Sequence, residues 1–170
     1  MKYLVVSDNH GDRDCLVTIY HQFKDQVDYF IHCGDSELPG DDELWQVFQV
    51  VQGNCDYDER YQKEQVIETP SDRIFVTHGH RYQVNYSLTT LGMKAQEVAA
   101  SIVLFGHTHR LGCEMMGSRL FLNPGSISQP RGLPIKSFAV ISSTPETFDV
   151  QYYDRTCQPV EDLQFSFKKD

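Results

Sequence analysis

Short, nearly continuous apolar runs alternate with helix-like segments along the first two thirds of the chain. The runs are rich in β-branched and aromatic residues, which is typical of strands buried on both faces. They occupy Tyr3–Val6, Tyr29–Cys33, Val47–Val51, Ile74–Thr77 and Ile102–Phe105. Two intervening segments, Asp12–Lys24 and Leu88–Ala100, carry apolar residues at helical spacing. This part of the chain is therefore predicted to have an α/β structure.

The last third of the chain shows a different pattern, in which apolar and polar residues alternate. The alternating segments are separated by Gly, Pro and Ser, which favours antiparallel strands. They lie at Gly112–Met116, Arg119–Leu122, Ser137–Ser142, Thr147–Tyr153 and Asp162–Phe167. We expect a single domain over residues 1–170, with an α/β front, a β-rich end and two sheets.

Composition narrows the possible partners. The 170 residues amount to about one ordinary domain. With 24 acidic and 15 basic residues, the formal net charge is −9. This balance excludes broad binding to nucleic acid through a basic surface, and it argues against attraction to an anionic membrane. Seven histidines are the unusual component of such an acidic chain.

Cysteine usage and hydropathy predict a cytoplasmic protein. The five cysteines are widely spaced and include no CxxC pair, so a disulfide framework or a cysteine zinc site is not expected. Only four apolar residues separate Met1-Lys2 from Ser7, which is too few for a signal-peptide core. No apolar stretch approaches the ~20 residues that a spanning helix needs.

Each buried run of the first two thirds is followed by a short turn that contains Asp, Asn or His. The turns contain Asp8-Asn9-His10, Gly34-Asp35, Gly53-Asn54-Cys55-Asp56, His78-Gly79-His80 and Gly106-His107-Thr108-His109. Because ligands bind at the carboxyl ends of the strands in open α/β sheets, we expect these five turns to converge on one site.

The polar residues of these turns are oxygen and nitrogen ligands, which suit Mn²⁺, Fe²⁺ or Zn²⁺. The candidate ligands are Asp8, His10, Asp35, Asn54, His78, His107 and His109. Seven ligands are too many for one catalytic zinc, which typically takes three from the protein. They are enough for two ions that share a bridging carboxylate, as in phosphatases and nucleases.

The order of these turns resembles the calcineurin-like metallophosphoesterase superfamily, whose pattern runs Asp-x-His, Gly-Asp, Gly-Asn-His-Asp/Glu, Gly-His and Gly-His-x-His. The resemblance spans residues 8 to 109. Asn123-Pro124-Gly125-Ser126 and Pro130-Arg131 further resemble the small single-domain phosphodiesterase subgroup. The resemblance implies a four-layer α/β/β/α sandwich of two mixed β-sheets.

The resemblance also implies a ligand set and a reaction. One divalent ion would take Asp8, His10, Asp35 and His109, and the other would take Asp35, Asn54, His78 and His107. The ions are expected to be Mn²⁺, with Ni²⁺, Fe²⁺ or Zn²⁺ as alternatives. A hydroxide bridging them would attack phosphorus in line, so the implied activity is a two-metal phosphoesterase, foremost a phosphodiesterase acting on a small phosphate ester. Exposed sheet edges leave a homo-oligomer open.

The third turn departs from the family pattern. Cys55 stands where many members carry a histidine thought to protonate the leaving group, and the neighbouring Asp56 would orient that group. These two residues are therefore the candidate catalytic residues beyond the ligands. Water or His80 could protonate the leaving group instead, or the enzyme could prefer leaving groups that need little protonation.

Two other functions stay open on the same fold. One is a non-catalytic protein-interaction scaffold, the role of a relative in an endosomal sorting coat. The other is hydrolysis of another bond, such as an amide, by a two-metal site. The four histidines kept at ligand positions favour the phosphoesterase. The substrate stays open among a cyclic dinucleotide, a nucleotide diester, a phospholipid head group and a small monoester.

Overall fold

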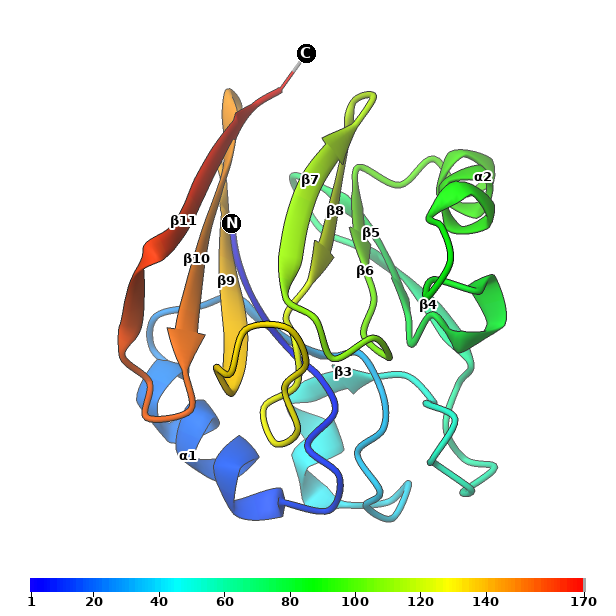
Figure 1. The fold of residues 1–170 in the computed structure, drawn as a ribbon, viewed down its shortest axis with the longest axis vertical. Helices are drawn as coiled ribbons and strands as arrows, with labels where there is room; N and C mark the ends of the chain where they lie inside the picture. The colour runs from blue at the N-terminus through cyan, green and yellow to red at the C-terminus, as the bar shows by residue number, and fades with distance from the viewer. Residues whose placement is uncertain (170) are drawn as a thin grey trace.

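The computed structural model describes residues 1–169 and contains two mixed β-sheets that pack face to face (Figure 1). The first sheet runs in the order β11 (Pro159–Lys168), β10 (Thr147–Asp154), β9 (Ser137–Ser143), β1 (Lys2–Val6), β2 (Tyr29–His32) and β3 (Phe48–Val50). The second runs in the order β4 (Glu64–Glu68), β5 (Arg73–Thr77), β6 (Ile102–Leu104), β8 (Arg119–Asn123) and β7 (Gly112–Met116).

Each sheet has a parallel part and an antiparallel part. β1, β2 and β3 pair in parallel, as do β5, β6 and β8. β9, β10 and β11 pair antiparallel beside β1, while β4 and β7 pair antiparallel at the edges of the second sheet. The α/β front and β-rich end are thus confirmed, but the five buried runs do not share one sheet. Three belong to the first sheet and two to the second.

Alternation of side chains along β1 shows where the core lies. Tyr3 and Val5 point between the two sheets and join a core cluster with Ile74 and Leu104 of the second sheet. The intervening residues of β1 point to the outer face of the first sheet. This period-2 alternation places fully buried residues on both faces, which explains why the run reads as continuously apolar.

One helix covers the outer face of each sheet. α1 (Arg13–Phe23) begins after Asp12, whose carboxylate accepts a hydrogen bond from the Cys15 N–H at 3.2 Å, and packs on the first sheet. α2 (Thr89–Glu97) packs on the second sheet through Leu91 and Ala95, and Figure 1 shows it outside that sheet. The predicted α/β/β/α sandwich is therefore confirmed. No helix within residues 1–169 is both long and apolar enough to cross a membrane.

The main element missing from the sequence prediction is β4. It is an edge strand that pairs antiparallel with β5, and its sequence, Glu-Gln-Val-Ile-Glu, offers only two apolar residues. Two short 3₁₀-helices were also not predicted, η1 (Glu43–Gln46) and η2 (His80–Tyr82).

Candidate metal centre

The five predicted turns meet at one end of the sandwich although they come from two sheets. Within the first sheet, the Asp8 and His10 N–H groups donate to the carbonyl oxygens of Gly34 and Asp35, each at 3.1 Å. Between the sheets, the His107 N–H donates to Oδ2 of Asp8 at 3.3 Å. The site is therefore built where the carboxyl ends of the two parallel parts lie opposite one another.

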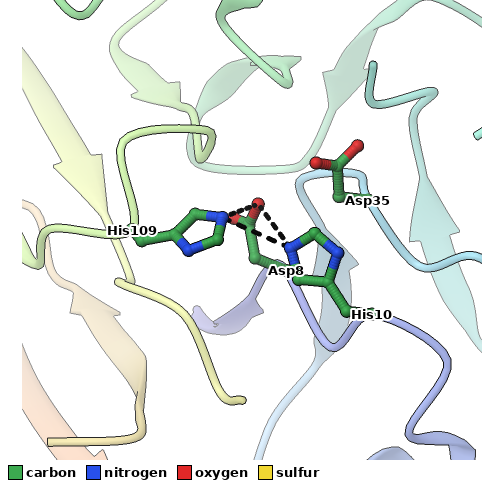
Figure 2. A group of neighbouring side chains, drawn as sticks. All are labelled: Asp8, His10, Asp35 and His109. Carbon is green, nitrogen blue, oxygen red and sulfur yellow. Dashed lines mark hydrogen bonds and ion pairs between the residues drawn. The ribbon is translucent and has the colours of Figure 1, made fainter. Parts of the chain in front are cut away.

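Asp8, His10, Asp35 and His109 form the first group of candidate ligands. One potential ligand atom from each lies within 4.8 Å of the others. Nε2 of His109 is 3.1 Å from Oδ1 of Asp8, and Nε2 of His10 is 3.8 Å from the same oxygen. Figure 2 shows both rings turned toward the Asp8 carboxylate, with Asp35 on the neighbouring loop. These are the four residues predicted for one metal.

The Asp8 carboxylate shows that this group suits a cation. Its Oδ1 is buried and makes no hydrogen bond with any residue that the structure describes, although imidazole nitrogens of His10, His78 and His109 lie within 3.9 Å. A buried anionic oxygen without a partner is costly. A divalent ion held by the oxygen and the ring nitrogens would remove that cost, and the donor set is one that such ions accept.

Asn54, His78 and His107 form a second group beside the first. Nε2 of His78 lies 3.1 Å from Oδ1 of Asn54, which in turn lies 2.9 Å from Nδ1 of His107. The same nitrogen of His78 is 3.3 Å from Oδ2 of Asp35. Asp35 thus touches both groups, which is where a bridging carboxylate would have to lie.

Three of the four histidines are oriented by acceptors that are not themselves among the predicted ligands. Nδ1 of His10 lies 2.6 Å from Oε1 of Glu37, and Nδ1 of His109 lies 2.7 Å from the Gln129 carbonyl oxygen. Nδ1 of His78 lies 2.7 Å from the carbonyl oxygen of Cys33. An N–H donated outward leaves the Nε2 lone pair facing the site, as is usual for metal-ligating histidines.

His107 differs from the other three histidines in the ring nitrogen that faces the site, which is Nδ1 and not Nε2. Its Nδ1 faces Asn54, and its Nε2 lies 2.9 Å from the side-chain amide nitrogen of Asn85. Sequence reasoning found neither Asn85 nor Glu37. No local signal marks them, since an acid two residues after Asp35 and an asparagine in a polar turn are both ordinary.

The backbone of the site is strained. Asp8, His10, Asp35, His107 and His109 all have φ between +46° and +68°, a region that residues other than glycine rarely adopt. Such conformations persist only where the surrounding structure enforces them, and they cluster at functional sites.

Two glycines allow the turns to pack against the acidic side chains. A Cβ on Gly53 would collide with Asp35, and a Cβ on Gly106 would collide with Ser7 and Asp8. The glycines of the predicted turns therefore act by permitting close approach of the backbone.

The charges of the site favour ionised carboxylates. Burial alone would raise the pKa of Asp8 and of Asp35. The imidazole of His109 beside Asp8 lowers the pKa of that carboxyl, and the imidazole of His78 beside Asp35 holds the pKa of Asp35 well below its usual value. Two ionised carboxylates form an anionic pocket that attracts cations.

Cys55 and Asp56 take different positions. The Cys55 N–H donates to Oδ1 of Asp35 at 2.7 Å, and burial raises the pKa of its thiol to about 11. Both oxygens of Asp56 accept hydrogen bonds from the loops around it. The donors are the N–H groups of Asp35, Glu37 and Gly53 and the Ser36 hydroxyl. Asp56 thus ties the Asp35 loop to the Gly53 loop, and the catalytic role of both residues stays a prediction.

His80 lies close to this group as well. Its ring centroid is 5.4 Å from that of His78, and its Nδ1 is buried without a hydrogen bond to any residue within 1–169. Burial, together with neighbouring positive charge, lowers the pKa of His80 to about 4. Its imidazole is therefore neutral near pH 7.

The candidate ligands are open to small molecules. A hollow of about 360 Å³ is lined by His10, Asp35, Asn54, Cys55 and His107, and by Arg131 at its side. Cys55 and a guanidinium therefore share the space in which a substrate would meet the ligands.

Known proteins share both the sequence and the fold. The family described as the calcineurin-like phosphoesterase superfamily domain matches residues 1–145. "Probable metallophosphoesterase YsnB" of Bacillus subtilis (strain 168) is 37% identical over 164 residues, which cover 96% of this chain and 97% of that protein. A Streptococcus pneumoniae TIGR4 crystal structure, described as a predicted phosphoesterase, is 37% identical with a TM-score of 0.96, covering 99% of this chain and 97% of its own.

A more distant likeness concerns the fold alone. Vps29 of Entamoeba histolytica, in a crystal structure complexed with Zn²⁺, is 23% identical with a TM-score of 0.72, covering 100% of this chain and 99% of its own. The family match and the bacterial relatives decide the assignment: the chain belongs to the calcineurin-like phosphoesterase superfamily.

Proposed function

We propose that this chain is a phosphodiesterase that uses two divalent ions, with Asp35 as the shared ligand. The observation that carries the proposal is the position of Asp35 between the His10–His109 group and the His78–Asn54 group. A two-metal site has its ions ~3.5–4 Å apart, so a single carboxylate that reaches both groups is its defining part. Mn²⁺ is the first ion to test, with Ni²⁺, Fe²⁺ and Zn²⁺ as alternatives.

When bound, the ions would supply positive charge at the phosphate oxygens and make a water molecule acidic enough to attack at neutral pH. The residues of the chain hold this arrangement in place. Glu37 and the Gln129 carbonyl fix the rings of His10 and His109, and Asn85 fixes that of His107. Arg131, at the side of the hollow, offers a cation to the phosphate of the substrate.

The diester is favoured over a monoester by the resemblance of Asn123-Pro124-Gly125-Ser126 and Pro130-Arg131 to the small phosphodiesterase subgroup. Charge does not select between the two ester classes, because two divalent ions would outweigh the carboxylates of Asp8 and Asp35. In the hydrolysis, a water oxygen bonds to phosphorus, one ester P–O bond breaks, and the leaving oxygen takes a proton. Cys55 occupies the place of a stronger donor, so esters of acidic alcohols should react fastest.

The scaffold alternative receives weaker support. Its basis is the fold shared with Vps29 at 23% identity, and a shared fold does not imply a shared role. All four histidines predicted as ligands are kept and face one site, which a scaffold would not require.

The test is hydrolysis of bis(p-nitrophenyl) phosphate against p-nitrophenyl phosphate across Mn²⁺, Ni²⁺, Zn²⁺ and Mg²⁺. We expect metal-dependent turnover that prefers the diester and falls more than ~100-fold in Asp35→Asn, because the shared ligand is lost. Asp25→Asn, an exposed acid after α1, is the matched control. The absence of turnover with every metal, or full activity in Asp35→Asn, would overturn the proposal.

A further inference from the structure

A second cavity, of about 660 Å³, adjoins the candidate metal centre. It is larger than the hollow above the ligands, and its volume lies within the ~300–1,000 Å³ typical of small-molecule sites. Arg131 lines both spaces. Asn85, on the wall of the cavity, is the residue that contacts Nε2 of His107. The cavity therefore begins at the metal centre, and a group bound in it would be continuous with an ester bound at the ligands.

The walls of this cavity are suited to a ligand that contains a flat ring. Leu88, Phe105 and Phe121 contribute to its lining, and they pack with α2 on the outer face of the second sheet. Apolar and aromatic walls with a few polar groups are typical of pockets that bind flat organic ligands.

The cavity also offers two cations in an acidic chain. Arg110 and Arg131 both line it. Within residues 1–169, their hydrogen bonds use the backbone N–H groups, and neither guanidinium pairs with a carboxylate. Four of the other arginines, Arg13, Arg60, Arg73 and Arg155, are paired with acids, while Arg81 and Arg119 are not paired with any acid that the structure describes but do not line the cavity. Two unpaired guanidinium groups beside an apolar space are suited to a ligand that carries its own anionic group.

Glu114 on β7 also lines the cavity and is the one carboxylate among its lining residues. Arg131 lies where the cavity meets the hollow above the ligands, and Glu114 does not line that hollow. An exocyclic amine on a bound ring could donate to this carboxylate.

We propose that the cavity binds one arm of a nucleotide diester, with the base between the apolar walls and the arm's own phosphate on Arg110. The inference rests on the proposed phosphodiesterase function, which would place the linking phosphate at the metal centre. The substrate class is therefore a short dinucleotide that bears a terminal phosphate. Hydrolysis adds water across the linking phosphate: one P–O bond breaks, and the freed ribose oxygen takes a proton.

Binding to the metal-free protein tests the cavity without turnover. AMP and adenosine are titrated into chelator-treated protein and followed by calorimetry. AMP should bind at least about tenfold tighter than adenosine, and Arg110→Ala should remove that difference, because a charged hydrogen bond is lost. Lys24→Ala removes an exposed cation next to α1, and it should leave the difference in affinity between AMP and adenosine unchanged. Equal binding of the two compounds, or an unaltered difference in a folded Arg110→Ala, overturns the inference.

Rates of hydrolysis distinguish failure of the cavity proposal from failure of the proposed phosphodiesterase function. With Mn²⁺, 5′-phosphorylated diadenosine (pApA) should show a kcat/KM at least about tenfold above that of ApA, with the difference in KM. In Arg110→Ala the two should become equal. If methyl p-nitrophenyl phosphate is hydrolysed but pApA and ApA react alike, the cavity proposal fails while the phosphodiesterase stands. If no diester is hydrolysed, both fail. Release of inorganic phosphate from pApA, leaving ApA, also contradicts the proposal.

Discussion

The Nε2 atoms of His10 and His109 lie 3.3 Å apart, and both face the buried carboxylate of Asp8 (Figure 2). The Nδ1 atoms of the two rings lie against the Glu37 carboxylate and the Gln129 carbonyl. With their protons donated outward, the two rings present lone pairs to one point beside an anion. A cation at that point resolves the repulsion, which is the physical basis of the metal proposal.

The contact between Glu37 and His10 predicts a measurable effect on metal affinity. Glu37→Ala removes the acceptor that orients the ring, so Mn²⁺ affinity should fall about 10–100-fold. Glu37→Gln keeps an acceptor oxygen without the charge, and its loss should be smaller. Isothermal titration calorimetry measures both, with the exposed Glu161→Ala as the control. Affinity equal to wild type in Glu37→Ala would show that the ring needs no such support.

Gly53 provides a steric test of the position of Asp35. A Cβ at residue 53 would collide with the Asp35 carboxylate, so Gly53→Ala should lower the free energy of unfolding by about 1–3 kcal/mol and weaken metal binding. Gly92→Ala is the control. It lies in α2 with no neighbour closer than 4.0 Å to the added Cβ, and it should stabilise the helix by about 0.5–1 kcal/mol. A Gly53→Ala protein that binds metal normally would contradict the close approach.

Asp56 is expected to contribute mainly to the stability of the fold. Asp56→Ala leaves three backbone N–H groups and the Ser36 hydroxyl without their acceptor, so the free energy of unfolding should fall by about 2–4 kcal/mol. Urea denaturation measures this, with Asp25→Asn expected within about 0.5 kcal/mol of wild type. A catalytic role alone would lower turnover and leave stability unchanged.

The burial of the His32 ring predicts how the free energy of unfolding depends on pH. The ring is fully buried, its Nε2 lies 2.8 Å from Oδ1 of Asn9, and burial lowers its pKa to about 4. The unfolded chain binds a proton near pH 6.5, and the folded protein does not until about pH 4. Stability from this group is therefore present above pH 6.5 and lost as the pH falls toward 4, by up to about 3 kcal/mol.

Urea denaturation of the metal-free protein at pH 7 and pH 5 measures this loss. His32→Gln should reduce the loss, whereas the exposed His21→Gln should not. An undiminished loss in His32→Gln would assign the effect to other groups.

The sequence predicts the strands and turns well because their signals are local. A buried run such as Tyr3–Val6 is apolar on both faces, and the turn after it carries Asp8 and His10. β4 was missed because an edge strand half open to solvent needs few apolar residues. The convergence of the five turns on one site was predicted, whereas the division of their strands between two sheets follows only from the structure.

The groups that orient the ligands could not be predicted. Glu37 and His10 are 27 residues apart, and Asn85 and His107 are 22 residues apart. Their contacts depend on how loops of two sheets are brought together, and a single sequence holds no record of that. Arg110 likewise gains significance only through the cavity that it shares with Arg131.

The central claim, that Asp35 joins two ion sites, is tested most directly by counting metal. Wild-type protein loaded with Mn²⁺ and freed of excess ion by dialysis is measured by elemental analysis. Two ions per chain are predicted, with a loss of at least one in Asp35→Asn and no change in Asp25→Asn. One ion or none in the wild-type protein, or two in Asp35→Asn, would contradict the account.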